Sequence, residues 1–249
     1  MKTINLDNLL ELPYSVEEAV NRLRINIGFL GSEVRKIMVI SSIPNEGKSF
    51  VAAQIWRQMA NVGTPSVLLD MDLRKSVLKG TLGFKGESKG TSDYLAGSAT
   101  LDDVLCHTQL ENGDIILNTS NVMNPSFLLD SKRFQGMVDE LASRYRYVFI
   151  DTPPLDFVSD GERIGSLCDG AILVVRSGMI PAKMVRDTAA RLERCGCRIL
   201  GVVLNRASAG TGGYYSKHYG KYYGKKYYGK YYGSKYYYYG SSSKKKKEK

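Results

Sequence analysis

The sequence predicts an α/β protein with a doubly wound, mostly parallel sheet and helices on both faces. Short runs of uninterrupted apolar residues, such as KIMVIS, YVFID and AILVVR, alternate along the chain with segments of helical character. Strands that are apolar at every position are buried on both faces, which is typical of parallel sheets. A chain of 249 residues is long enough for one such domain with a sizeable core and an appendage.

The predicted elements follow one another in a regular order. The strands are expected at residues 36–41, 66–70, 114–119, 147–151, 171–176 and 199–205. The helices are expected at residues 15–30, 48–62, 126–143, 159–167 and 181–194. A capping box formed by Ser15 and Glu18 is expected to open the first helix. Residues 1–14 are expected to be a loose arm, and residues 71–113 a long excursion with short helices.

The net charge of +10 is concentrated at one end of the chain. Residues 214–249 contain eleven Lys and one Glu, whereas residues 1–213 contain 24 basic and 24 acidic side chains. A balanced body does not favour a nucleic-acid surface. The last segment also holds thirteen of the seventeen tyrosines and has no aliphatic residue with which to build a core. We therefore predict a domain over residues 1–209 and a disordered tail over residues 210–249.

The four cysteines match no zinc or disulfide spacing, which favours reduced cytosolic thiols. The start of the chain does not look like a signal peptide. No apolar run approaches the roughly twenty residues that a membrane span needs. We expect a soluble, cytoplasmic protein that reaches the inner face of the membrane only through a partner.

A phosphate-binding loop is predicted between the first strand and the second helix. The segment SSIPNEGKSF ends in Gly47-Lys48-Ser49, as a Walker A loop does, although Ser42 replaces the first glycine of the general pattern. Backbone N–H groups and a helix N-terminus bind phosphate oxygens in such a loop. The lysine neutralises the β- and γ-phosphates, and the serine supplies an oxygen to Mg²⁺. The predicted nucleotide-binding residues of the loop are Asn45, Glu46, Gly47, Lys48, Ser49 and Phe50.

Carboxylates follow two of the predicted strands. VLLDMDLR contains Asp70 and Asp72, and VFIDTPP contains Asp151. Oxygen ligands suit Mg²⁺, so Ser49, Asp72 and Asp151 are the predicted metal ligands. Either Asp70 or Asp72 could accept the proton of an attacking tyrosine, whose pKa is near 10, and Asp70 is slightly favoured. The predicted catalytic residues are Lys48, Asp70, Asp72 and Asp151.

Together, SSIPNEGKS, VLLDMDLR, VFIDTPP and the tyrosine-rich tail resemble the bacterial tyrosine kinases (BY-kinases) of capsule and exopolysaccharide synthesis, members of the P-loop family. The resemblance implies ATP and Mg²⁺ as cofactors and a contact between Asn205 and adenine. It also implies a ring of subunits, autophosphorylation between neighbours, and a transmembrane activator of the polysaccharide copolymerase kind. Other protein substrates are compatible with it. The tail tyrosines expected to be phosphorylated are Tyr222, Tyr223, Tyr227, Tyr228, Tyr231, Tyr232, Tyr236, Tyr237, Tyr238 and Tyr239.

The sequence departs from the family pattern in two places that matter for function. Asn45 stands where the family usually has a glycine, and asparagine tolerates positive φ better than most residues. The family's ring-forming helix usually reads E-x-x-R-x-x-R, whereas the helix at 15–30 has Asn21 at the middle position. The predicted oligomer contacts of this helix are Glu18, Arg22 and Arg24.

Two other functions remain open from the sequence. A partition-type P-loop ATPase switch would hydrolyse ATP and use the tail only to bind a partner. An adaptor would bind nucleotide without turnover. The tail itself could instead hold single-stranded nucleic acid or anionic lipid, because it combines Tyr with Lys.

Overall fold

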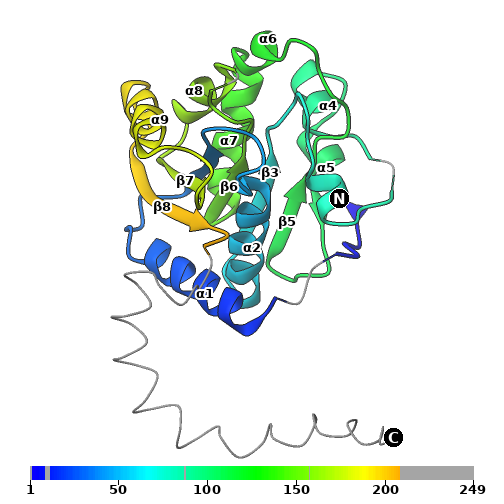
Figure 1. Ribbon diagram of the computed structural model, residues 1–249. Coiled ribbons are helices and arrows are strands. Elements are labelled where there is room, and N and C mark those ends of the chain that lie inside the picture. Colours follow the sequence, from blue (N-terminus) through cyan, green and yellow to red (C-terminus); the bar gives the residue numbers. More distant parts are fainter. Residues whose placement is uncertain (1, 9–11, 87, 157, 208–249) are drawn as a thin grey trace, which may run out of the picture. The chain divides into compact units, whose positions relative to one another are not determined.

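The computed structural model describes residues 2–8, 12–86, 88–156 and 158–207, and Met1–Arg206 form one compact unit. Within these residues, eight strands form a sheet in the order β1-β4-β5-β3-β6-β2-β7-β8 (Figure 1). The β4–β5 pair is antiparallel and the other neighbouring pairs of this sheet are parallel. The predicted doubly wound, mostly parallel α/β fold is therefore confirmed. The predicted tail at 210–249, with its tyrosines, lies outside the described residues.

The strands are β1 (Lys2–Thr3), β2 (Lys36–Ser41), β3 (Ser66–Asp70), β4 (Cys106–His107), β5 (Gly113–Ile116), β6 (Tyr147–Asp151), β7 (Gly170–Arg176) and β8 (Ile199–Asn205). The helices are α1 (Tyr14–Gly28), α2 (Lys48–Asn61), α3 (Leu78–Thr81), α4 (Thr91–Ala96), α5 (Leu101–Val104), α6 (Ser126–Leu129), α7 (Lys132–Arg144), α8 (Asp160–Gly165) and α9 (Ala182–Arg194). None of the helices in the described part of the chain is both long and apolar enough to span a bilayer.

The helices cover the sheet in two layers, each with its own buried cluster. α1, α2 and α3 pack on one face, and α4 to α9 pack on the other. In the first cluster α2 contributes Trp56, which is fully buried and whose indole N–H donates to the carbonyl of Ser66, 3.3 Å away. Burial of the central strands on both faces explains why their sequences are apolar throughout.

The sheet register determines where the polar strand ends meet. Val39 of β2 and Asp70 of β3 both pair with Asp151, at the end of the strand between them. The phosphate loop that follows β2 is therefore at the same edge as both acidic motifs. Ligands of doubly wound folds bind at this carboxyl edge.

The start of the chain differs from the expectation. The arm predicted to be loose begins with β1, which pairs with β4, and continues with the buried side chains of Ile4 and Leu6. The expected capping box of the first helix is wrong. α1 begins at Tyr14 after Pro13, and no side chain caps it.

The predicted helix at 126–143 is divided in two. α6 ends at Leu129, and α7 begins after Ser131, whose hydroxyl accepts a hydrogen bond from the amide of Phe134. Serine competes for backbone donors in this way and favours a helix start over a helix interior.

Candidate active site

The phosphate loop connects β2 to α2 through two residues with positive φ. Asn45 has φ 67° and Gly47 has φ 93°. The expectation that asparagine can replace glycine in this turn is confirmed. A Cβ added to Gly47 would lie 2.1 Å from the side-chain nitrogen of Asn205, so only glycine fits there without movement of that amide. The loop thus combines a left-handed turn with a close contact from β8.

Glu46 and Asn205 connect the loop to its surroundings. The buried carboxylate of Glu46 accepts from the amide of Ile43, at 2.9 Å, and from the amide of Arg176, at 3.2 Å. Asn205 donates its side-chain N–H to the carbonyl of Glu46, at 2.9 Å. The Glu46 side chain therefore holds the loop against β7, and this role was not predicted from the sequence.

The ammonium of Lys48 lies close to both a hydroxyl and a carboxylate of the site. Its Nζ is 3.3 Å from the hydroxyl of Ser49 and 3.6 Å from a carboxylate oxygen of Asp72. Both Lys48 and Ser49 belong to the first turn of α2, whose N-terminus favours negative charge. This arrangement can attract a phosphate chain and hold a lysine beside it.

The three aspartates occupy different environments. Asp70 is fully buried: it accepts from the Ser76 hydroxyl, from the Asn118 amide at 3.2 Å and from the Asp72 amide at 3.2 Å. Burial, with the nearby charge of Asp151, raises the pKa of Asp70 to about 8. Burial also raises the pKa of Asp151 to about 6, against the opposing effects of Lys48 and Ser49. Asp72 lines the cavity.

The donor set fits a hard divalent cation. Ser49 contributes a hydroxyl, and Asp72 and Asp151 contribute carboxylates, the oxygen ligands that Mg²⁺ takes together with water and phosphate oxygens. Asp151 Oδ1 is buried and has no hydrogen-bond partner among the described residues. A buried carboxylate oxygen without a partner is costly, and a bound cation would satisfy it.

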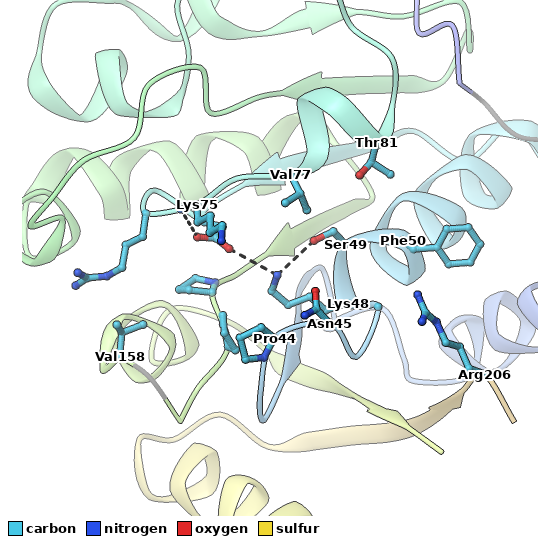
Figure 2. A pocket seen from close by; sticks show the side chains of 15 residues that line it. Pro44, Asn45, Lys48, Ser49, Phe50, Lys75, Val77, Thr81, Val158 and Arg206 are labelled. Atoms are coloured by element: carbon cyan, nitrogen blue, oxygen red, sulfur yellow. Dashed lines mark hydrogen bonds and ion pairs between the residues drawn. The ribbon is translucent and has the colours of Figure 1, made fainter. Parts of the chain in front are cut away.

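A cavity of about 430 Å³ opens over the phosphate loop. Figure 2 shows Lys48 near its middle, Lys75 and Val158 toward one end, and Phe50 and Arg206 toward the other. The lining residues are Pro44, Asn45, Gly47, Lys48, Ser49, Phe50, Asp72, Arg74, Lys75, Val77, Thr81, Pro153, Pro154, Val158 and Arg206.

Most of the predicted site residues meet in this cavity. The predicted residues that line it are Asn45, Gly47, Lys48, Ser49, Phe50 and Asp72. Asp70, Asp151, Glu46 and Asn205 are not among its lining residues. The predicted oligomer contacts Glu18, Arg22 and Arg24 lie on α1, where Arg24 donates to the side chain of Asn21.

Arg74 and Arg206 line the cavity but were not predicted as site residues. Arg74 makes a two-pronged ion pair with the buried carboxylate of Asp160, at 2.6 and 3.0 Å, and donates to the carbonyl of Met123, at 3.2 Å. The D-x-D-x-R spacing was a signal for Arg74, because it places the arginine just past the strand end. Nothing comparable in the sequence distinguishes Arg206.

Comparison with known proteins places the chain among kinases. No family model matches it. A tyrosine-protein kinase CpsD of Streptococcus agalactiae is 35% identical over 219 residues, which are 87% of this chain and 95% of that protein. The solved kinase domain of the Escherichia coli tyrosine kinase ETK has a TM-score of 0.72 and 31% identity, over 86% of this chain and 87% of that domain.

A more distant likeness concerns the fold alone. The septum site-determining protein MinD of Pyrococcus horikoshii, solved with Mg-ADP, has a TM-score of 0.61 and 24% identity, over 72% of each chain. The kinases are thus more similar to this chain than this ATPase is, in both sequence and structure. The chain belongs to the bacterial protein-tyrosine kinases, the BY-kinases of the P-loop class, and is an enzyme of that kind.

Proposed function

We propose that this kinase transfers the γ-phosphoryl group of Mg-ATP to tyrosines in the C-terminal tail of a neighbouring copy. The observation that carries the proposal is the position of the Lys48 ammonium, inside the cavity and within 4 Å of both Ser49 and Asp72. A phosphoryl group held there would lie beside a cation, a hydroxyl and a carboxylate. Phosphoryl transfer depends mostly on such positioning and charge stabilisation.

Different residues of the site bind different parts of ATP. The amides of Asn45, Glu46 and Gly47 and the α2 N-terminus receive the phosphates, and Lys48 neutralises their charge. Phe50 lies at the end of the cavity toward which we expect the base to extend (Figure 2). In this proposal Asn205 contacts the adenine. That contact requires Asn205 to give up or share its hydrogen bond to the Glu46 carbonyl.

Ser49, Asp72 and Asp151 would hold Mg²⁺, which would neutralise phosphate charge when bound. A side chain of the protein accepts the proton that the tyrosine loses. As the tyrosine oxygen bonds to phosphorus and the bond to the β-phosphate oxygen breaks, the phenolic proton passes to a carboxylate and ADP leaves. Access favours Asp72 for this role, because Asp72 lines the cavity and Asp70 does not.

The same proposal includes a regulatory setting. Neighbouring copies assemble in a ring through α1, and a transmembrane protein of the polysaccharide copolymerase kind recruits and activates the kinase at the inner face of the membrane. Phosphorylation of the tail of residues 210–249 then regulates capsular or exopolysaccharide synthesis. Each phosphate adds about two negative charges, so modification reverses the charge of a basic tail.

Mass spectrometry of two mixed full-length chains tests the proposal. Wild-type protein of natural isotope content is incubated with ¹⁵N-labelled Lys48→Met protein and Mg-ATP, with a membrane activator present in a parallel arm. We expect phosphate on heavy peptides from residues 214–249, because an inactive chain can be labelled only by its neighbour. Lys48→Met protein alone serves as the control, with labelling reduced at least about a hundredfold.

Two results would contradict the proposal in different ways. Phosphate on light peptides only would mean that each chain labels its own tail. Release of inorganic phosphate with an unmodified tail in both arms would favour the partition-type ATPase switch.

A further inference from the structure

The segment of residues 123–127, here called the rim, contacts Arg74, which lines the cavity, and exposes two large apolar side chains. Met123 is 97% exposed and Phe127 is 85% exposed. Both residues follow β5, at the carboxyl edge of the sheet, and only Pro125 and its two neighbours separate them. Large apolar side chains exposed to this extent, close together and next to an active site, mark a surface that receives a partner.

Backbone and side-chain contacts connect this rim to the site. The Met123 carbonyl accepts a hydrogen bond from Arg74, which lines the cavity. The amide of Val122 donates to the carbonyl of Leu73, at 2.7 Å. α6, which carries Phe127, packs on α8, whose Asp160 holds the other side of the Arg74 guanidinium. These contacts connect the segment that carries Met123 and Phe127 to the residues that follow β3, among them Asp72.

The cation that contacts the Met123 backbone does not oppose a basic peptide, although the exposed Lys75 also lines the cavity. The guanidinium of Arg74 is neutralised by Asp160, at 2.6 Å. The cavity lining also includes Pro153, Pro154 and Val158, which are apolar. An aromatic side chain that packs on the rim would meet the sulfur of Met123 or the ring of Phe127, both of which interact favourably with aromatic rings.

We propose that Met123 and Phe127 form a docking surface for a tyrosine of a second copy's tail, next to the tyrosine that enters the active site. The inference rests on the proposed function and adds to it the part of the enzyme that recognises the substrate. The composition of the tail identifies the group that would bind. Residues 214–249 contain no aliphatic side chain, so tyrosine rings are their main apolar groups. Twelve of these thirteen tyrosines have a tyrosine as chain neighbour, six of them as pairs in K-Y-Y-G repeats, so when one ring is in the site its neighbour is available to the rim.

Steady-state kinetics with short tail peptides test the proposal. Full-length kinase receives a peptide of residues 220–226, which carries the pair Tyr222–Tyr223, or one of two forms with Tyr222→Ser or Tyr223→Ser. The chain's own tail is present equally in every arm, so ratios of KM are comparable. For wild-type kinase we expect KM to be about tenfold lower for the paired peptide than for the single-tyrosine forms.

The variant Met123→Ser/Phe127→Ser is expected to remove this preference. Its KM for the paired peptide should rise about tenfold, to the value for the single-tyrosine forms, with the effect in KM rather than kcat. Val62→Ser removes an apolar side chain that is 50% exposed at the end of α2, and serves as the matched control. The affinity of each variant for ATP checks that the cavity is intact.

A double variant that keeps the wild-type preference for paired tyrosines would overturn the docking surface while leaving the kinase assignment standing. So would a defect seen only in stimulation by the membrane activator, because the surface would then belong to that partner. If the wild-type kinase labels none of the peptides and not its own tail, the proposed function itself fails and the docking surface fails with it.

Discussion

Asp70 and Asp72 show how two identical residues in one short motif acquire different chemistry. Asp70 is the last residue of β3 and is enclosed by the Ser76 hydroxyl and the Asn118 amide. Asp72 lies two residues further on, lines the cavity and is 3.6 Å from Lys48. The first is therefore suited to fixing the strand end, and the second to contact with a substrate.

Substitution of each aspartate separates these two roles. We expect Asp72→Asn to lower kcat for tail phosphorylation at least about a hundredfold, because an amide cannot accept the phenolic proton. Asp70→Asn should lower kcat clearly less, since that side chain does not reach the cavity. Initial rates at saturating Mg-ATP and peptide measure both effects, and parallel titration of Mg-ATP separates loss of metal binding from loss of proton transfer.

Asp102→Asn is the matched control, because Asp102 is 62% exposed on α5 and pairs only weakly with Arg144, at 3.4 Å. A larger loss of kcat in Asp70→Asn than in Asp72→Asn would assign the base to Asp70 instead.

The sequence indicated which residues belong to the candidate site better than it indicated the environment of each side chain. The positive φ of Asn45 followed from the glycine it replaces in the family pattern and from the tolerance of asparagine for that conformation. The burial of Asp70 did not follow, because it depends on Asn118, which lies 48 residues away in sequence. Spacing within a motif carries no information about such distant contacts.

At the scale of elements, Glu46 joins the phosphate loop to β7. Its two carboxylate oxygens accept from amides at opposite ends of the contact, Ile43 in the loop and Arg176 at the end of β7. A buried acceptor with two donors fixes the loop relative to the sheet. Lys48 is two residues further along the chain, so its position depends on this connection.

Glu46→Gln should therefore loosen the loop. A glutamine can accept only one of the two hydrogen bonds and turns an N–H group toward the other amide, which costs about 1–3 kcal/mol in unfolding free energy. We expect urea denaturation to show this loss and nucleotide titration to show weaker ATP binding. Glu33→Gln, at a side chain that is 68% exposed, should change neither quantity. Full retention of stability in Glu46→Gln would refute the connection.

The elements predicted most accurately are strands with uninterrupted apolar runs, whether central and buried or, like β8, at an edge of the sheet and partly exposed. β2, β3, β6 and β8 have the bounds predicted from their apolar runs. The division of the helix predicted at 126–143 was missed because its apolar periodicity continues across Ser131. β1 and β4 have only two residues each and pair with one another across a hundred residues of chain, which no local pattern reveals.

At the scale of the whole molecule, α1 presents exposed apolar side chains on its outer side. Its inner side is attached to α2, where Glu17 lies 3.7 Å from Arg57, and Ile27 is buried. Its outer side carries Tyr14, Ile25 and Phe29, which are 67%, 40% and 82% exposed. Helical periodicity places these three side chains on one stripe, together with Glu18 and Arg22.

This stripe suggests how assembly could persist with Asn21 at the middle position of the family's helix pattern. Apolar contacts would supply association energy, while Glu18 and Arg22 would set the register of the two helices through charge.

We expect Ile25→Ser/Phe29→Ser to shift the full-length protein toward monomer, because loss of the two side chains removes roughly 2–4 kcal/mol from each contact between copies. Light scattering coupled to size-exclusion chromatography measures the mass over a range of concentrations. Met179→Ser, at an exposed apolar residue in the loop between β7 and α9, should leave the mass unchanged. Since the proposed labelling is between copies, the Ile25→Ser/Phe29→Ser protein should also label its tail more slowly, and this defect should shrink as protein concentration rises. An oligomer of wild-type mass in that variant would exclude the stripe as the contact, whatever the labelling rate.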